Sequence, residues 1–176
     1  MRNKKLYSFV LSAMFLSLGL MLPFLTGQIP EIGNMLLPMH IPVMLCGLIC
    51  GKRYVFFVGL ILPLLRCVVF GMPPIYPNAI WMAIELATYG LVIVFMYARI
   101  KRKDLIGVYI SLVSAMILGR IAWGVIKAIL LGLGGKVFTV SMFIAGGFID
   151  ALPGIILQLI LIPTIMTILV KRRILK

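Results

Sequence analysis

The chain has 176 residues, of which 63% are hydrophobic, and its mean hydropathy is +1.20. A water-exposed surface does not tolerate this balance in a chain of this size, so the sequence predicts an integral membrane protein embedded in a lipid bilayer. The net charge of +13 would suggest a nucleic-acid partner in a soluble protein, but the basic residues lie between apolar runs, so no nucleic acid is expected.

Six apolar runs follow one another along the chain, separated by glycine, proline and charged residues. A membrane-spanning helix needs roughly 20 apolar residues, so the chain has room for about six spans and no separate soluble domain. We therefore expect an all-α integral membrane protein, a six-transmembrane-helix bundle that forms a single domain over residues 1–176. The expected spans are residues 6–26, 36–50, 54–71, 77–98, 105–131 and 142–170.

The basic residues predict the direction in which the chain crosses the membrane. They cluster at the N-terminus, at residues 52–53, at residues 99–103 and at the C-terminus. The three loops between these clusters contain only Glu31 and Lys136 as charged residues. Because loops that stay in the cytoplasm are enriched in lysine and arginine, both termini are expected in the cytoplasm.

Several polar side chains lie inside the apolar runs, where a charge is costly and usually has a function. Counting about 1.5 Å of rise per helical residue from the nearest loop places all of them in the outer half of the bilayer or near its middle. This asymmetry predicts an outward-facing cavity. The alternative is that the charges pair with one another to fix helix packing, with Lys127 extending toward the outer interface. The residues are His40, Arg66, Glu85, Arg120, Lys127 and Asp150.

Two tryptophans are candidates for stacking on a ligand ring. Trp81 lies one helical turn before Glu85, and Trp123 lies one turn from both Arg120 and Lys127. Residues at this spacing share one face of a helix. Weaker candidates for the same pocket are Phe70, Tyr76 and Asn78.

The only histidine lies between Pro38 and Pro42. Prolines free backbone carbonyl groups, which are tolerated where they line a cavity. His40 is therefore expected either to face the cavity or to donate to one of these carbonyls.

Neither a metal nor a resident cofactor is expected. With one histidine and no Cys-x-x-Cys pair, a transition-metal site is improbable. The thiols of Cys46, Cys50 and Cys67 lie in apolar segments, which indicates packing rather than a disulfide framework.

Two other classes of function remain open from the residues alone. One is a small integral-membrane enzyme that acts on a lipid or an isoprenoid, with Glu85, Asp150 and His40 as acid and base groups. The sequence supplies no clear nucleophile or metal motif for such an enzyme. The other class is a structural or channel-like subunit whose charged pairs serve only its architecture.

Short helices with both ends inside, an outer polar cavity and small residues in the first helix resemble the substrate-binding S components of energy-coupling factor (ECF) vitamin transporters. In that family the first helix carries an Ala-x-x-x-Ala motif that docks on a transmembrane T subunit. The matching stretch here is SAMFLSLG, in which Ala13 and Ser17 take the two small positions and Ser8 and Ser12 form a second small pair. Small residues at this spacing let another helix approach closely. The segments LPMHIPVMLCGLICGKR, GRIAWG and ALPGIILQLILIP are also similar to S components.

The resemblance covers essentially the whole chain and implies a function. The protein would capture a water-soluble vitamin or cofactor precursor at the outer face of a prokaryotic cell membrane. It would then reorient against the T subunit, driven by two cytoplasmic ATPases. The binding groups would come from the outer ends of several helices. Because three of the intramembrane charges are cations and two are carboxylates, a ligand with a carboxylate or phosphate is favoured, such as pantothenate, a folate or a cobalamin.

Overall fold

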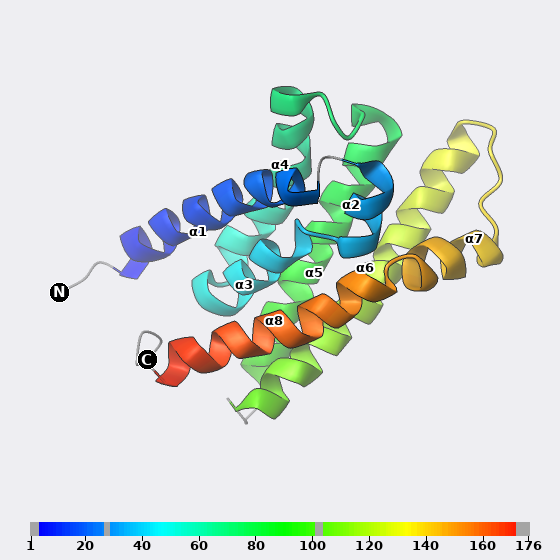
Figure 1. Ribbon diagram of the computed structural model, residues 1–176. Coiled ribbons are helices and arrows are strands. Elements are labelled where there is room, and N and C mark those ends of the chain that lie inside the picture. Colours follow the sequence, from blue (N-terminus) through cyan, green and yellow to red (C-terminus); the bar gives the residue numbers. More distant parts are fainter. Residues whose placement is uncertain (1–3, 27–28, 101–103, 172–176) are drawn as a thin grey trace.

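The computed structural model describes residues 4–26, 29–100 and 104–171, and every regular element in these ranges is a helix. Figure 1 shows that the first turn of α1 and the last turn of α8 lie at one end of the bundle, whereas α2 and α7 lie toward the other. The α-helices are α1 (Lys4–Met21), α2 (Pro30–Leu36), α3 (His40–Cys50), α4 (Lys52–Phe70), α5 (Ile80–Arg99), α6 (Leu105–Leu133), α7 (Val140–Ile144) and α8 (Leu152–Lys171).

Five helical segments of the described chain are long and apolar enough to cross a membrane. The second expected span, residues 36–50, is not among them. Its apolar run forms only α3, which has 11 residues, and a helix of that length extends roughly 16 Å, about half of a hydrocarbon core. A sixth span is therefore not confirmed, and the side of the membrane that holds the termini stays a prediction. The five segments are Lys4–Leu25, Lys52–Phe70, Ile75–Arg99, Leu105–Leu133 and Leu152–Lys171.

The sixth expected span, residues 142–170, is interrupted in the structure. The chain forms α7, then one turn of π-helix at Ala145–Ile149, and α8 begins only at Leu152. Two glycines in the π-helical turn weaken a continuous helix. Pro153 is tolerated in the first turn of α8, where a backbone N–H has no helical partner. Asp150 consequently lies at a junction between helices rather than inside one.

Helix α5 is the centre of the bundle and packs against α3, α4 and α6. Its contact with α4 is close because both surfaces are made of small residues. A Cβ atom added at Gly59 of α4 would lie 2.7 Å from the backbone nitrogen of Ala87. At that distance the helices would have to move apart. This close approach holds α4 and α5 side by side.

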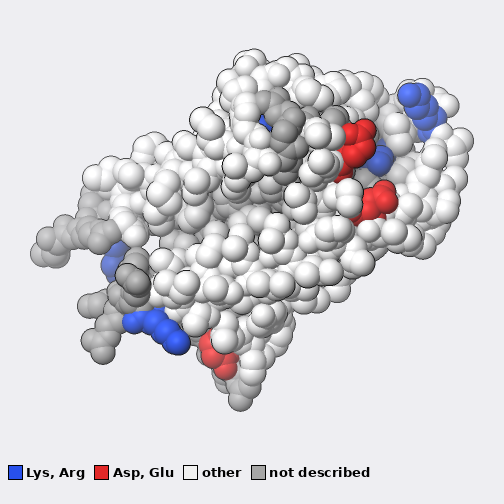
Figure 2. Space-filling model, in the orientation of Figure 1, with Lys and Arg blue, Asp and Glu red and all other residues white. Residues whose placement is uncertain are grey.

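On the face seen in Figure 2, most of the visible charged side chains lie toward the two ends of the molecule, and the surface between them is largely uncharged. Glu31, Lys136 and Asp150 are exposed in or beside α2 and α7, and Arg99 and Lys171 are exposed at the ends of α5 and α8. A band without charge is what contact with lipid chains requires. The described surface therefore fits a chain that lies across a bilayer.

The close contact of α4 with α5 leads to a stability prediction. Gly59→Ala should lower the free energy of unfolding by about 1–3 kcal/mol, because the added methyl group meets backbone atoms that cannot move aside. Thermal unfolding of the purified protein in detergent measures the effect. Gly132→Ala is the matched control, since a Cβ atom there would have nothing within 4 Å. Equal melting temperatures for the two variants would show that the close contact is not formed.

Candidate functional site

A cavity of about 440 Å³ lies where the first turns of α3 and α5 meet the second half of α6. The segment before α3 and the proline-containing loop between α4 and α5 also line it. Its volume falls in the range of roughly 300–1,000 Å³ that is typical of small-molecule sites. The cavity therefore has the dimensions of a pocket for a small ligand.

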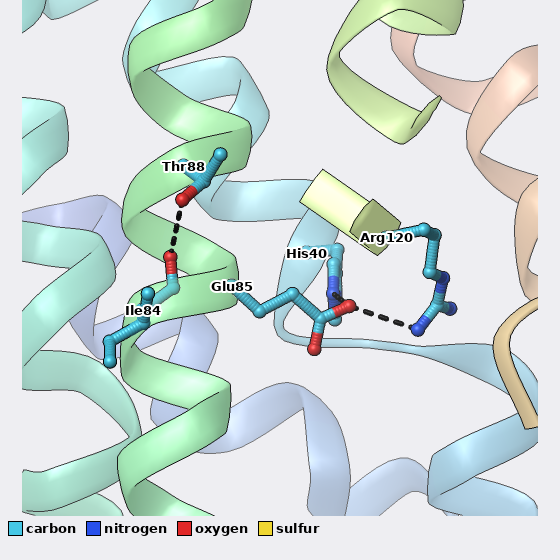
Figure 3. A network of polar contacts seen from close by, with 5 residues as sticks. All are labelled: His40, Ile84, Glu85, Thr88 and Arg120. Atoms are coloured by element: carbon cyan, nitrogen blue, oxygen red, sulfur yellow. Dashed lines mark hydrogen bonds and ion pairs between the residues drawn. The ribbon is translucent and has the colours of Figure 1, made fainter. Parts of the chain in front are cut away.

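Glu85 of α5 is the buried acidic group of this cavity and is 2% exposed. Arg120 Nη1 of α6 donates a hydrogen bond to Glu85 Oε1 at 2.9 Å, and His40 Nε2 of α3 donates to the same oxygen at 3.3 Å (Figure 3). A carboxylate in an apolar interior is stable only when it is paired and hydrogen-bonded. This three-residue network therefore joins α3, α5 and α6 in the wall of the cavity.

The local sequence explains why His40 reaches Glu85. Pro42 lies in the first turn of α3, where its missing N–H costs no helical hydrogen bond, so the helix begins at His40. The imidazole ring then packs edge-on against Tyr89 of α5, with 4.9 Å between the ring centroids. Of the two roles expected for His40, the structure gives it a place in the cavity wall and pairs it with a side chain rather than a carbonyl.

Several buried donors and acceptors in this network lack a partner among the described residues. They are Arg120 Nε, Arg120 Nη2 and His40 Nδ1. A buried polar atom without a partner costs about 1–3 kcal/mol. Since Arg120 and His40 both line the cavity, a polar ligand group or a water molecule there is positioned to reduce this cost.

Lys127 of α6 is surrounded by aromatic rings. Its Nζ atom lies 4.4 Å from the ring centroid of Trp123, 5.2 Å from Trp81 and 5.3 Å from Phe138. A cation within about 6 Å of a ring face is attracted to the ring. Lys127 is therefore held by the aromatic rings that surround it.

Arg66 of α4 is 4% exposed and forms no ion pair with any described residue. Its Nη1 donates to the carbonyl of Leu20, in the last turn of α1, at 3.2 Å. Its guanidinium carbon lies 5.7 Å from the ring centroid of Phe24 and 5.8 Å from that of Phe70. The charge is thus stabilised by a helix end and two rings, without a carboxylate.

Nine of the eleven side chains that the sequence suggests for the pocket line this one cavity: His40, Arg66, Asn78, Trp81, Glu85, Arg120, Trp123, Lys127 and Asp150. The other two do not. Tyr76 is 54% exposed, and its hydroxyl donates to the carbonyl of Leu130 at 2.9 Å. Phe70 packs edge-on against Phe24 and contacts the cavity only through Arg66. Whether the nine residues bind a ligand stays a prediction.

The spacing argument for Trp123 agrees with the geometry, because the guanidinium carbon of Arg120 lies 5.7 Å from its ring centroid. Sequence reasoning missed Tyr89 and Gln158, which are both buried, with an exposed fraction of 1% each. Gln158 could have been noticed as an amide within the last apolar run. Loop residues also form part of the apolar wall of the cavity, among them Met72, Pro73 and Pro74. No pattern in the sequence marked these loop residues as part of a pocket.

The small residues of α1 do not all face outward. Ala13 and Ser17 are exposed, and Ser8 is half-buried. Ser12 is 6% exposed, and its hydroxyl donates to the carbonyl of Phe9 at 2.7 Å. Ser12 therefore packs inside the bundle in this structure, and its expected part in docking stays a prediction.

A family model described as "ECF transporter, substrate-specific component" matches residues 7–166. The chain belongs to this family. No curated protein and no solved structure matches it. The resemblance drawn from the sequence is confirmed, and the chain is a multi-pass membrane protein, an S component of an ECF transporter and not an enzyme.

The shared carboxylate of this S component leads to a prediction. Glu85→Gln should lower the free energy of unfolding by about 3–5 kcal/mol, because it leaves Arg120 buried without a counter-charge. The double variant Glu85→Gln, Arg120→Gln should lose less free energy of unfolding than the two single variants lose together. Thermal unfolding in detergent measures all three proteins.

Thr88→Val is the control on the same helix. Thr88 Oγ1 donates only to the carbonyl of Ile84, one turn earlier in α5, at 2.7 Å (Figure 3). Its loss should change stability by about 1 kcal/mol or less. Strict additivity of the Glu85 and Arg120 substitutions would contradict the pairing.

Proposed function

We propose that this S component captures a water-soluble vitamin or cofactor precursor in the cavity around Glu85. It delivers the compound, together with a T subunit and two cytoplasmic ATPases, into a prokaryotic cell. The observation that carries the proposal is the convergence of polar and aromatic side chains from α3, α4, α5 and α6 on one cavity. In a chain this apolar, so many polar groups at one place need a purpose beyond packing.

The arrangement resembles a binding pocket more than a purely architectural set of ion pairs. Architectural charges are expected to neutralise one another, as Glu85 and Arg120 do. Arg66 and Lys127 have no carboxylate within ion-pair distance among the described residues. Small-molecule sites combine an apolar wall with a few polar groups that fix the ligand's orientation. Trp81 and Trp123 supply such a wall here.

The positions of the basic residues support an outward-facing cavity. Helix α4 begins at the exposed Lys52 and reaches Arg66 in its last turns. Helix α5 runs the opposite way, from Trp81 near the cavity to the exposed Arg99. The basic ends therefore lie away from the cavity. Because basic ends remain in the cytoplasm, the cavity would open to the outside.

The first helix supplies a surface for the T subunit. Ala13 and Ser17 are exposed one turn apart on α1, and the surrounding exposed side chains Phe9, Val10 and Met14 are apolar. Small residues at this spacing allow another helix to approach closely in a membrane. We infer that this face of α1 contacts the T subunit.

Ligand capture is tested by thermal unfolding of the purified protein against a panel of vitamins and their precursors. One compound should stabilise the protein by about 2.7 kcal/mol at 100 times its dissociation constant. Asn78→Ala should weaken this effect, because Asn78 lines the cavity. Thr164→Val is the control, since Thr164 is exposed on α8 and its hydroxyl bonds only within that helix. Equal effects of the two substitutions would place the ligand elsewhere.

Docking is tested by copurification of the S component with the T subunit. Ala13→Leu should reduce the recovered T subunit at least about tenfold, because the larger side chain prevents close helix approach. Ala98→Leu is the matched control, since Ala98 is exposed on α5 and the residues four positions away, Val94 and Arg102, are not small. Normal recovery of the T subunit with Ala13→Leu would rule out this face of α1.

A further inference from the structure

The charges that line the cavity do not cancel. Among the described lining residues, the cations are Arg66, Arg120 and Lys127, and the carboxylates are Glu85 and Asp150. Glu85 is already bound by Arg120. Asp150 is exposed at the junction before α8, so water stabilises its charge. The cavity interior is therefore left with two cations that no carboxylate neutralises.

Lys127 makes the cavity unfavourable for a cationic ligand. An aromatic cage is the usual site for an organic cation, but here the space between Trp81, Trp123 and Phe138 is occupied by the ammonium group of Lys127. A second cation would have to displace it. The same cation would also face Arg66 without a compensating carboxylate.

Arg66 is the cation best suited to bind an anionic group. Its side chain is 4% exposed and lines the cavity. One hydrogen bond to a described residue, from Nη1 to the carbonyl of Leu20, uses only part of its donors. A guanidinium group presents five donors in a planar fork that matches a carboxylate or a phosphate. The flanking rings of Phe24 and Phe70 hold the fork in place.

From these observations we propose that the captured compound is a small organic anion whose carboxylate or phosphate group pairs with Arg66. This inference rests on the proposed function. Helices α4 and α6 each pack against α5, and Arg66 of α4 and Arg120 of α6 both line the cavity. The neutral end of the compound then lies toward Arg120 and His40, whose buried atoms lack partners. An amide or hydroxyl group there both donates and accepts, as these atoms require.

The two tryptophans of the protein both line the cavity, so intrinsic fluorescence reports its occupancy directly. The probes are pairs that differ only in the acid group: nicotinate and nicotinamide, biotin and its amide, lipoate and lipoamide, pantothenate and pantothenol. The acid of at least one pair should bind about 10- to 100-fold more tightly than its neutral partner, the effect of a hydrogen bond to a charged group.

Arg66→Gln should remove this preference. It should weaken the binding of the acid and leave the affinity for the neutral compound unchanged. Arg66→Lys should restore part of it, because the charge remains without the planar fork. Lys136→Gln is the control for general electrostatic attraction, since Lys136 is an exposed cation that does not line the cavity. Melting temperatures of all variants show whether each is folded. If Arg66→Gln does not fold, Arg66→Lys carries the comparison.

Two results would overturn the proposal: equal affinity for both members of the responding pair, or an acid preference that persists in folded Arg66→Gln. If no probe binds, the molecules released from the cell-purified protein are identified by mass spectrometry. A released carboxylate or phosphate that needs Arg66 supports the proposal. A released neutral or cationic molecule overturns the anion class and leaves the proposed function standing. If no probe of the panel binds and no molecule is released, both the anion class and the proposed function are contradicted.

Discussion

A single carboxylate oxygen, Glu85 Oε1, is the point on which the cavity of this molecule depends. It accepts hydrogen bonds from Arg120 Nη1 and His40 Nε2, so side chains from α3, α5 and α6 meet at one atom. In an apolar interior neither the carboxylate nor the guanidinium is stable alone. The helices that carry them are consequently fixed in their relative positions. The three residues of this network line the cavity, so their arrangement determines part of its shape.

Among the described residues, three buried or half-buried cations are stabilised by three different means. Arg120 is paired with a carboxylate, Lys127 is enclosed by aromatic rings, and Arg66 contacts a helix end and two rings. The last two means leave the positive charge without a formal counter-charge. A neutralising partner can therefore come from a ligand. This difference separates a binding pocket from a set of structural ion pairs, in which each charge already has its opposite.

Sequence reasoning located the cavity because polar residues are rare in this chain and their heights along the helices can be counted. It could not foresee that Asp150 lies at a junction, because the effect of two glycines and Pro153 on one apolar run depends on packing. The start of α3 at His40 was similarly hard to foresee, because the apolar run at residues 36–50 begins before the helix and continues through Pro38. Ser12 shows a further limit: the spacing of small residues does not reveal which face of a helix is buried.

The choice between pairing and binding for the intramembrane charges was also open from sequence alone. The structure shows the pairing of Glu85 with Arg120, and the same Arg120 lines the cavity with nitrogens that have no partner among the described residues. Ligand binding by these charges stays a prediction. Membership in the ECF substrate-specific components makes this chain an S component, and the use of this cavity for the substrate is our proposal. The physical argument then concerns which chemistry the cavity accepts.

The most direct test of the account is an experimental structure of the S component saturated with its transported compound. The account predicts ligand density between Arg66 and Arg120, in contact with Trp81 and Trp123, with the Glu85 network intact beneath it. Density at any other position, or a cavity that stays empty at saturating compound, would contradict the central claim that this cavity is the substrate site.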